Sequence, residues 1–170
     1  MIILLASNQN NMRDLVMAVL KIQDIMTYPV ITQSINSTVS EAASTMCAHN
    51  IGSLIIVDSQ EKPVGIVTER DMLRKIIMTN RNPTATDIEQ IMSRPIITGH
   101  PKMDLEEAAK LMITKEIKRL LIIESGKLVG MVTLTDIVGS HPQIVSTLER
   151  SLSIDNLPKR LRKQLRKMKQ

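Results

Sequence analysis

The sequence predicts a mixed α/β fold built from two copies of one β-α-β-β-α unit. The first observation behind this prediction is a repeated heptad, GIVTERD at 65–71 and GMVTLTD at 130–136. The second is that the stretches before the heptads also repeat, with an offset of 66 residues. The third is that the apolar pattern changes from strand-like runs to helical spacing in the same order in both copies. A period this long exceeds the roughly 20 to 50 residues of solenoid repeats, so we interpret it as a duplicated unit.

Each copy is predicted to open with a short strand followed by a helix. VIT at 30–32 and IIT at 96–98 follow prolines and are β-branched, which favours extended backbone. Apolar residues then recur at i, i+3, i+4 and i+7, the spacing of one helix face. The residues on this face are Val39, Ala42, Ala43 and Met46 in the first copy and Leu105, Ala108, Ala109 and Met112 in the second.

Two further strands and a second helix complete each copy. The strands are predicted at 53–58 and 63–68 in the first copy and at 119–124 and 128–133 in the second. The second helix begins at the threonine of each heptad and is expected to run to about Met78 and to about Val138. The order β-α-β-β-α, written twice, predicts strands that are buried on at least one face.

The composition is that of a soluble globular protein. Of the 170 residues, 43% are apolar and 23% are charged, and no apolar run reaches the roughly 18 residues that span a membrane. The opening MIILLA lacks the basic leader of a signal peptide. We therefore expect a cytoplasmic protein without a transmembrane segment. The single Cys47 cannot form a disulfide within its own chain, and its apolar helical surroundings favour buried packing over reactivity.

The repeat divides the chain into four parts. The first copy covers 21–79 and the second covers 86–141. Residues 1–20 form an N-terminal segment that the pattern does not place, and 142–170 form a helical extension with a basic tail.

The heptads place a threonine and an aspartate where a strand gives way to a helix. Thr68 and Thr133 end the strands, and Asp71 and Asp136 follow three residues later. This spacing is typical of a capping box, in which the two side chains satisfy backbone N–H groups at the helix start. It also suits a ligand, since free amides can hold a phosphate and a carboxylate can accept hydrogen bonds from the two hydroxyls of a ribose. Both interpretations stay open, because one does not exclude the other.

The two copies together resemble a tandem pair of cystathionine-β-synthase (CBS) domains, the arrangement called a Bateman module. The resemblance covers roughly residues 21–140. DIMTYPVIT at 24–32 and QIMSRPIIT at 90–98 resemble the opening segment of that family, and the heptads match its G-h-x-T/S-x-x-D/N signature, where h is apolar. The resemblance implies a stand-alone regulatory protein, two repeats packed around a pseudo-twofold axis, and two clefts that hold an adenosine compound.

The resemblance also implies which residues contact such a ligand. The two aspartates would accept from the ribose hydroxyls, the two threonines would contact ribose or phosphate, and the opening strands would meet the adenine. Residues just before the middle strand would face the phosphates. The nucleotide-binding positions implied in this way are Ile31, Thr32, Gly52, Ser53, Thr68, Asp71, Ile97, Thr98, Lys118, Arg119, Thr133 and Asp136.

The two copies differ at the positions expected to face phosphate. Gly52 and Ser53 in the first copy correspond to Lys118 and Arg119 in the second. An arginine can hold a phosphate with two hydrogen bonds and a lysine adds a point charge, whereas glycine offers only close backbone approach. The second copy is therefore the preferred phosphate site, unless both cations are ordinary surface charges. With no Trp or Phe in the chain, an adenine ring would lie between aliphatic side chains.

The sequence contains no pattern that predicts catalysis. His49, His100 and His141 fall at unrelated points of the repeat, and no Cys or His cluster has metal-ligand spacing. The heptads lack the glycine density of a P-loop. We therefore expect a protein that is not an enzyme and has no metal or catalytic cofactor.

The C-terminal tail from 155 to 170 has a net charge of +6, so the rest of the chain, whose total is +5, has a net charge of about −1. Between 155 and 170 a single acidic residue accompanies seven basic ones: Lys159, Arg160, Arg162, Lys163, Arg166, Lys167 and Lys169. Leucines at helical spacing predict a basic amphipathic helix there. Such a helix can bind nucleic acid phosphates, an acidic membrane surface or an acidic partner, or it can pack its leucines on the body or on a second subunit.

Two functions are therefore compatible with the sequence. The first is a regulatory, energy-sensing module that binds AMP, ADP or ATP, or alternatively S-adenosylmethionine, and signals occupancy to a protein effector by a conformational change, as a homodimer. The second is a nucleic-acid-associated dimer in which the CBS pair is a scaffold and the tail at 159–169 binds phosphates.

Overall fold

The computed structural model describes residues 20–144. The N-terminal segment and the basic helix expected between 155 and 170 lie outside the described residues. The elements in chain order are η1 (Ile22–Asp24), β1 (Thr32–Ser34), α2 (Val39–Ala48), β2 (Ser53–Val57), β3 (Pro63–Thr68), α3 (Glu69–Met72), η2 (Leu73–Ile77), η3 (Ile88–Gln90), β4 (Thr98–Gly99), α4 (Leu105–Thr114), β5 (Arg119–Glu124), β6 (Lys127–Thr133) and α5 (Leu134–Ser140). The mixed α/β class and the doubled β-α-β-β-α order are confirmed.

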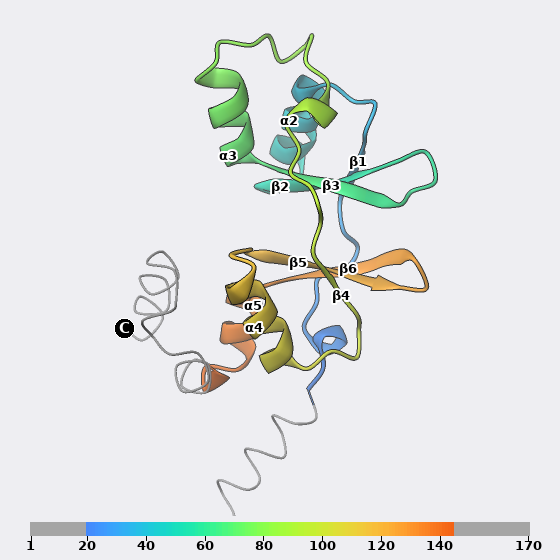
Figure 1. Cartoon of the computed structure of the whole chain (residues 1–170), viewed down its shortest axis with the longest axis vertical. Helices are drawn as coiled ribbons and strands as arrows, with labels where there is room; N and C mark the ends of the chain where they lie inside the picture. Colours follow the sequence, from blue (N-terminus) through green and yellow to red (C-terminus); the bar gives the residue numbers. More distant parts are fainter. Residues whose placement is uncertain (1–19, 145–170) are drawn as a thin grey trace, which may run out of the picture. The chain divides into compact units, whose positions relative to one another are not determined.

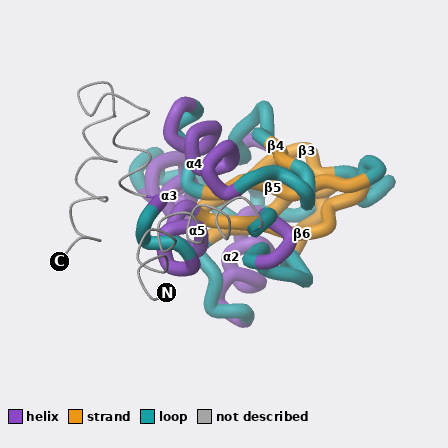
Figure 2. Tube along the Cα trace, turned by 90° about the horizontal axis from the view of Figure 1, so that it is seen from below, coloured by secondary structure: helices purple, strands orange, loops and turns teal. Residues whose placement is uncertain are grey.

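Each copy forms a three-stranded sheet with helices on one face (Figure 1). In the first copy the order is β1-β2-β3, with β1 parallel to β2 and β2 antiparallel to β3. In the second copy the order is β4-β5-β6. The strands of both sheets are short (Figure 2). The connection from β1 to β2 contains α2 and that from β4 to β5 contains α4, whereas β2 is joined to β3 and β5 to β6 by turns. The hairpin between β5 and β6 turns at Ser125 and Gly126, which both have positive φ (50° and 80°) as a two-residue hairpin turn requires.

Two sequence expectations about element boundaries are wrong. The opening strands begin at Thr32 and Thr98, two residues later than predicted, because ladder pairing in the first copy starts only where Thr32 lies opposite Ile55. The second helix of the first copy is not one regular helix to Met78. It changes after Met72 into the π-helical turn η2, in which the Met78 N–H donates to the Leu73 carbonyl at 3.0 Å.

The expectation that Cys47 is buried is also wrong, because its side chain is exposed. The buried face of α2 consists of Val39, Ala42 and Met46. Each residue along a helix turns the side chain by about 100°, so Cys47 lies off the face that Met46 occupies. In α4 all four residues of the predicted face are buried.

The described chain divides into two compact units that are not the two sequence copies. The first unit comprises Pro29–Thr98 together with Ile123–Val129. The second unit comprises the chain up to Tyr28, Gly99–Ile122 and the chain from Gly130 onward. The short segment that opens each copy, 21–28 in the first and 86–98 in the second, therefore belongs to the unit of the opposite copy. We call these two stretches the exchanged segments.

The core of the first unit shows this exchange directly. Val39 and Met46 from α2 and Leu54, Ile56 and Val67 from the sheet form one buried cluster. The cluster also includes Ile88, Ile91 and Met92, which belong to the opening segment of the second copy. The same segment extends the sheet, since the Ser93 N–H donates to the Ile66 carbonyl at 2.8 Å.

The second unit receives the opening segment of the first copy in the corresponding way. Ile22 is fully buried, and its N–H donates to the carbonyl of Met103 at 3.0 Å. Thr27 pairs with Met131 of β6 through two backbone hydrogen bonds of 2.8 and 3.1 Å. An ion pair of 2.6 Å between Lys21 and Asp104 lies at the start of the same segment.

The exchanged segments explain the glycine that begins each heptad. A Cβ at Gly65 would collide with the sulfur of Met92, and a Cβ at Gly130 would collide with the sulfur of Met26. Each methionine comes from the opening segment of the opposite copy. The repeated Gly and the repeated Met are therefore the two sides of one packing contact, made once in each unit.

Candidate functional site

The first heptad forms a capping box at the start of α3. The Thr68 hydroxyl accepts from the Asp71 N–H at 3.2 Å. The Oδ2 atom of Asp71 accepts in return from the Thr68 N–H at 3.0 Å and from the Thr68 hydroxyl at 2.6 Å.

The second heptad forms the same box at the start of α5. The Thr133 hydroxyl accepts from the Asp136 N–H at 3.1 Å, and Oδ2 of Asp136 accepts from the Thr133 N–H at 2.8 Å and from its hydroxyl at 2.7 Å. The capping interpretation of both heptads is therefore confirmed. In both boxes the carboxylate oxygen Oδ2 accepts the hydrogen bonds at the helix start, and the other oxygen, Oδ1, takes no part in the box.

The two aspartates differ at this second oxygen. Oδ1 of Asp71 lies 3.0 Å from the ammonium of Lys75, one helical turn further on. The same ammonium donates to the carbonyl of Ile91 at 2.6 Å. Among residues 20–144, Asp136 has no ion pair at its Oδ1.

The residue that corresponds to Lys75 in the second copy is Ser140. Its hydroxyl donates to backbone carbonyls of its own helix, those of Asp136 at 2.8 Å and Ile137 at 3.1 Å. Ser140 therefore supplies no positive charge to the carboxylate of Asp136.

The sheet of the first copy brings several predicted site residues onto one face. Ser53 lies opposite Thr68, and Thr32 lies opposite Ile55. Because side chains two residues apart on a strand share a face, Thr32, Ser53 and Thr68 lie on the same side of the sheet. The other side carries Leu54, Ile56 and Val67, which belong to the core.

The hairpin of the second copy brings the predicted cation close to the second heptad. Arg119 is the first residue of β5 and Thr133 is the last residue of β6. A hairpin places the start of its first strand beside the end of its second, so both lie at the same end of the sheet. Arg119 is half-buried and Lys118 just before it is exposed. This end of the sheet thus carries a guanidinium, a hydroxyl and, at the start of α5, the carboxylate of Asp136.

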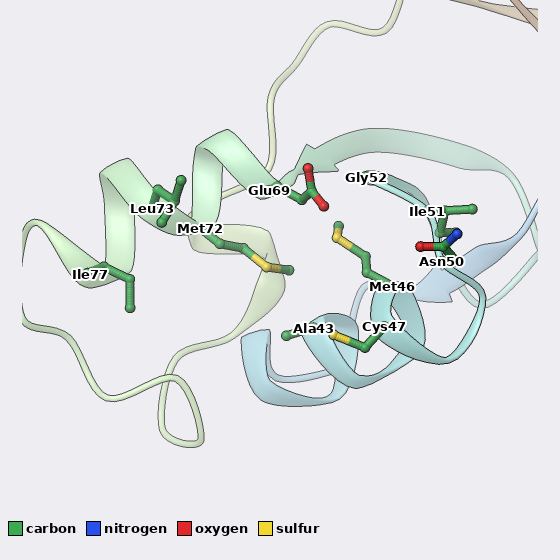
Figure 3. A pocket seen from close by; sticks show the side chains of 10 residues that line it. All are labelled: Ala43, Met46, Cys47, Asn50, Ile51, Gly52, Glu69, Met72, Leu73 and Ile77. Carbon is green, nitrogen blue, oxygen red and sulfur yellow. The ribbon is translucent and has the colours of Figure 1, made fainter.

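A cavity of about 510 Å³ lies elsewhere in the first unit, between α2 and the helical segment that follows β3 (Figure 3). Met46 and Met72 point into it from the two helices, and the carboxylate of Glu69 lies at its edge beside Gly52. Its lining residues are Ala43, Met46, Cys47, Asn50, Ile51, Gly52, Glu69, Met72, Leu73 and Ile77. Of the predicted nucleotide-binding positions only Gly52 lines this cavity, so it is distinct from the face that carries the heptad threonine.

The comparison with protein families agrees with the duplication. Residues 22–78 and residues 88–141 each match the model of the CBS domain. The chain belongs to the CBS-domain family. It contains two CBS domains in tandem, and such pairs are regulatory modules that typically bind ligands.

Similar CBS proteins occur in archaea and bacteria. An uncharacterized protein of Methanopyrus kandleri is 43% identical over 124 residues, which are 72% of this chain and 63% of that protein. A CBS domain-containing protein of Bacillus subtilis is 38% identical over 116 residues, 68% of this chain and 81% of that protein. The chain thus spans slightly less than two thirds of the Methanopyrus relative.

A similar solved structure is that of a hexameric CBS-CP12 protein from bloom-forming cyanobacteria. It has a TM-score of 0.68 and 28% identity, and the match covers 81% of this chain and 77% of that chain. The fold of the CBS pair therefore occurs in an assembly of several chains.

Sequence reasoning missed one residue at the heptad of the first CBS domain, Lys75. A signal for it was present, because a lysine four residues after an aspartate on a helix lies within reach of the carboxylate. Two predicted adenine-contacting residues, Ile31 and Ile97, are half-buried, and Thr98 is exposed. No group of His, Cys, Asp or Glu in the described part of the chain could hold a metal ion. Within that same part, no helix is both long and apolar enough to cross a membrane.

Proposed function

We propose that this CBS pair is a regulatory module that binds an adenosine compound of the AMP, ADP or ATP class and signals occupancy by a conformational change. The second CBS domain supplies the preferred site. Asp136 receives the ribose hydroxyls, Thr133 positions that carboxylate, and Arg119 with Lys118 holds phosphate. The corresponding positions of the first domain are Asp71, Thr68, Ser53 and Gly52. The module has no catalytic role.

The observation that carries this proposal is the state of the Asp136 carboxylate. Its Oδ2 is fixed by two hydrogen bonds from Thr133, while Oδ1 has no ion pair among residues 20–144. A carboxylate held in place on one side and open on the other is suited to accept hydrogen bonds from a diol. Arg119, at the same end of the sheet, adds the planar cation that phosphates prefer.

The first prediction is that Asp136→Asn weakens AMP binding by about 10 to 150-fold, because it removes roughly 1.5–3 kcal/mol of hydrogen bonding to a charged acceptor. Asparagine keeps an oxygen for the Thr133 N–H, so the start of α5 is retained. Isothermal titration calorimetry measures the change, with ADP, ATP and S-adenosylmethionine titrated in parallel to identify the ligand.

The matched control is Asp104→Asn, which changes the charge equally in the same unit. Asp104 is exposed and pairs with Lys21 rather than with any heptad residue. An Asp136→Asn protein that binds AMP as tightly as the Asp104→Asn protein would remove the ligand role from Asp136.

We propose further that the protein is a homodimer. The large apolar side chains of Leu73, Ile77 and Met78 are between 58% and 79% exposed. A group of exposed apolar side chains usually marks an interaction surface. A second copy of the chain is the proposed occupant, since a solved relative with this fold is hexameric. A native mass spectrum of the purified protein reports the subunit count and any retained nucleotide together. The alternative of nucleic acid binding rests on 159–169, outside the described residues.

A further inference from the structure

We infer that Lys75 closes the ligand position of the first CBS domain, so that the protein binds one adenosine compound per chain, at the second domain. The inference rests on the proposed function for its ligand, but its geometry concerns this chain alone. Lys75 acts in two ways: it neutralises Asp71, and it fastens the exchanged segment that opens the second CBS domain.

The neutralisation follows from the distribution of hydrogen bonds on Asp71. Thr68 occupies Oδ2 with two donors, and the ammonium of Lys75 lies 3.0 Å from Oδ1. The carboxylate is only 18% exposed, so water competes for it less than at an open surface. A ribose would have to displace a charged donor to reach this oxygen, and its two neutral hydroxyls are weaker donors than an ammonium.

The fastening follows from the second contact of the same ammonium. Lys75 donates to the carbonyl of Ile91 at 2.6 Å, and Ile91 is a fully buried core residue of the unit. Lys75 therefore joins the signature aspartate of the first domain to the segment exchanged from the second. Its position on the π-helical turn η2, rather than on a regular helix, places it in a kind of turn that is frequent at functional sites.

The second domain supplies an internal comparison. Ser140 occupies the position equivalent to Lys75, and its hydroxyl bonds to backbone carbonyls only. Among residues 20–144, the two domains thus share a capping box but differ in whether a cation pairs with the carboxylate. A second difference between the domains is that Gly52 and Ser53 of the first correspond to Lys118 and Arg119 of the second. Both differences favour the second domain as the ligand site.

A reciprocal exchange of these two residues tests the inference. Lys75→Ser gives the first domain the arrangement of the second, and Ser140→Lys does the reverse. Each variant is titrated calorimetrically with AMP and with adenosine. Adenosine is included because it has no phosphate, and the first domain has Gly52 and Ser53 where the second has the phosphate-binding cations Lys118 and Arg119. The charge control is Lys110→Ser, which removes a lysine from the half-buried i,i+4 pair with Glu106 on α4.

The expected stoichiometry is one AMP per chain for the unaltered protein and for Lys110→Ser. Lys75→Ser is expected to add a second adenosine site, and Ser140→Lys to weaken the remaining site by about tenfold or more. Two sites in the unaltered protein, or a single site in Lys75→Ser, would overturn the inference while leaving the proposed function intact. Absence of binding to every variant would instead overturn the proposed function.

The fastening role has a readout that needs no ligand. Hydrogen exchange of the Met92 and Ser93 amides, which bond to the carbonyls of Ile88 and Ile66, reports opening of the exchanged segment. Lys75→Ser is expected to accelerate this exchange by about fivefold or more relative to Lys110→Ser. Equal protection in the two variants would show that Lys75 does not hold the segment.

Discussion

Single residues at the start of α2 show how a capping box responds to pH. The Thr38 hydroxyl accepts from the Glu41 N–H at 3.2 Å, while the Glu41 carboxylate accepts from the Thr38 N–H at 2.7 Å. The Thr38 hydroxyl also donates to the same carboxylate oxygen at 3.0 Å. The hydrogen bond from the Thr38 backbone, and after it the one that the hydroxyl donates, lower the pKa of Glu41 below its ordinary value of 4.5. The charged form is therefore the one that the folded state favours.

The sign of the pH dependence follows from this lowered pKa. The contribution of Glu41 to the free energy of unfolding is fully present above pH 4.5, its unfolded value. It is lost as the pH falls through the lower pKa of the folded state. Thermal unfolding between roughly pH 6 and pH 3 should therefore be less steeply pH-dependent for Glu41→Gln than for the unaltered protein. Identical pH profiles would show that the box does not select the charged form.

At the scale of elements, the heptad glycine sets how closely β3 can approach the exchanged segment. Gly65→Ala would place a Cβ against the sulfur of Met92, a side chain that is 9% exposed and has little room to move. We expect the substitution to lower the free energy of unfolding by about 1–3 kcal/mol through overpacking. Urea unfolding monitored by circular dichroism measures the change.

Gly139→Ala is the matched control for this prediction. Nothing lies within 4 Å of a Cβ at Gly139, and the residue belongs to α5. Alanine is the better helix former there by up to about 1 kcal/mol, so the same substitution should stabilise or leave stability unchanged. Losses of equal size at both positions would argue against the Met92 contact.

At the scale of the whole molecule, the compact units and the sequence copies divide the chain differently, and this predicts which fragment folds. A fragment covering 29–98, with the bounds of the compact unit, contains Ile88 and Ile91. A fragment covering 21–79, with the bounds of the first sequence copy, lacks them. Burying these two side chains contributes about 3–6 kcal/mol, which is a large part of the roughly 5–15 kcal/mol that stabilises a typical domain.

We therefore expect a cooperative thermal transition, followed by circular dichroism, from fragment 29–98 and none from fragment 21–79. Both peptides contain all three strands of the first sheet together with α2 and α3. They differ in that 29–98 keeps the exchanged segment with Ile88 and Ile91, while 21–79 carries 21–28, which belongs to the other unit. A cooperative transition in 21–79 at an equal or higher temperature would show that the segment is dispensable.

Local pattern predicted most elements, because apolar spacing and the heptad capping are properties of neighbouring residues. Both boxes, Thr68 with Asp71 and Thr133 with Asp136, follow from a spacing of three residues alone. The exchange of the opening segments did not follow, since Met92 and Gly65 are joined only by packing between distant stretches. Lys75 was overlooked for a related reason: its spacing reaches Asp71, but its second partner, the Ile91 carbonyl, comes from the exchanged segment.

The exchange also sets an order of events on the ribosome. The residues from Pro29 to Thr98 contain nearly all of one unit, and they leave the exit tunnel before Gly99–Ile122 and the chain from Gly130 onward, which belong to the other unit. Ile22 and Met26, although made earlier, must wait for Met103 and Gly130 to emerge. At about 5–20 residues per second this delay lasts several seconds. For that time the oldest apolar stretch of the described chain has no burial site, and it is the part of the nascent chain where a chaperone would be most useful.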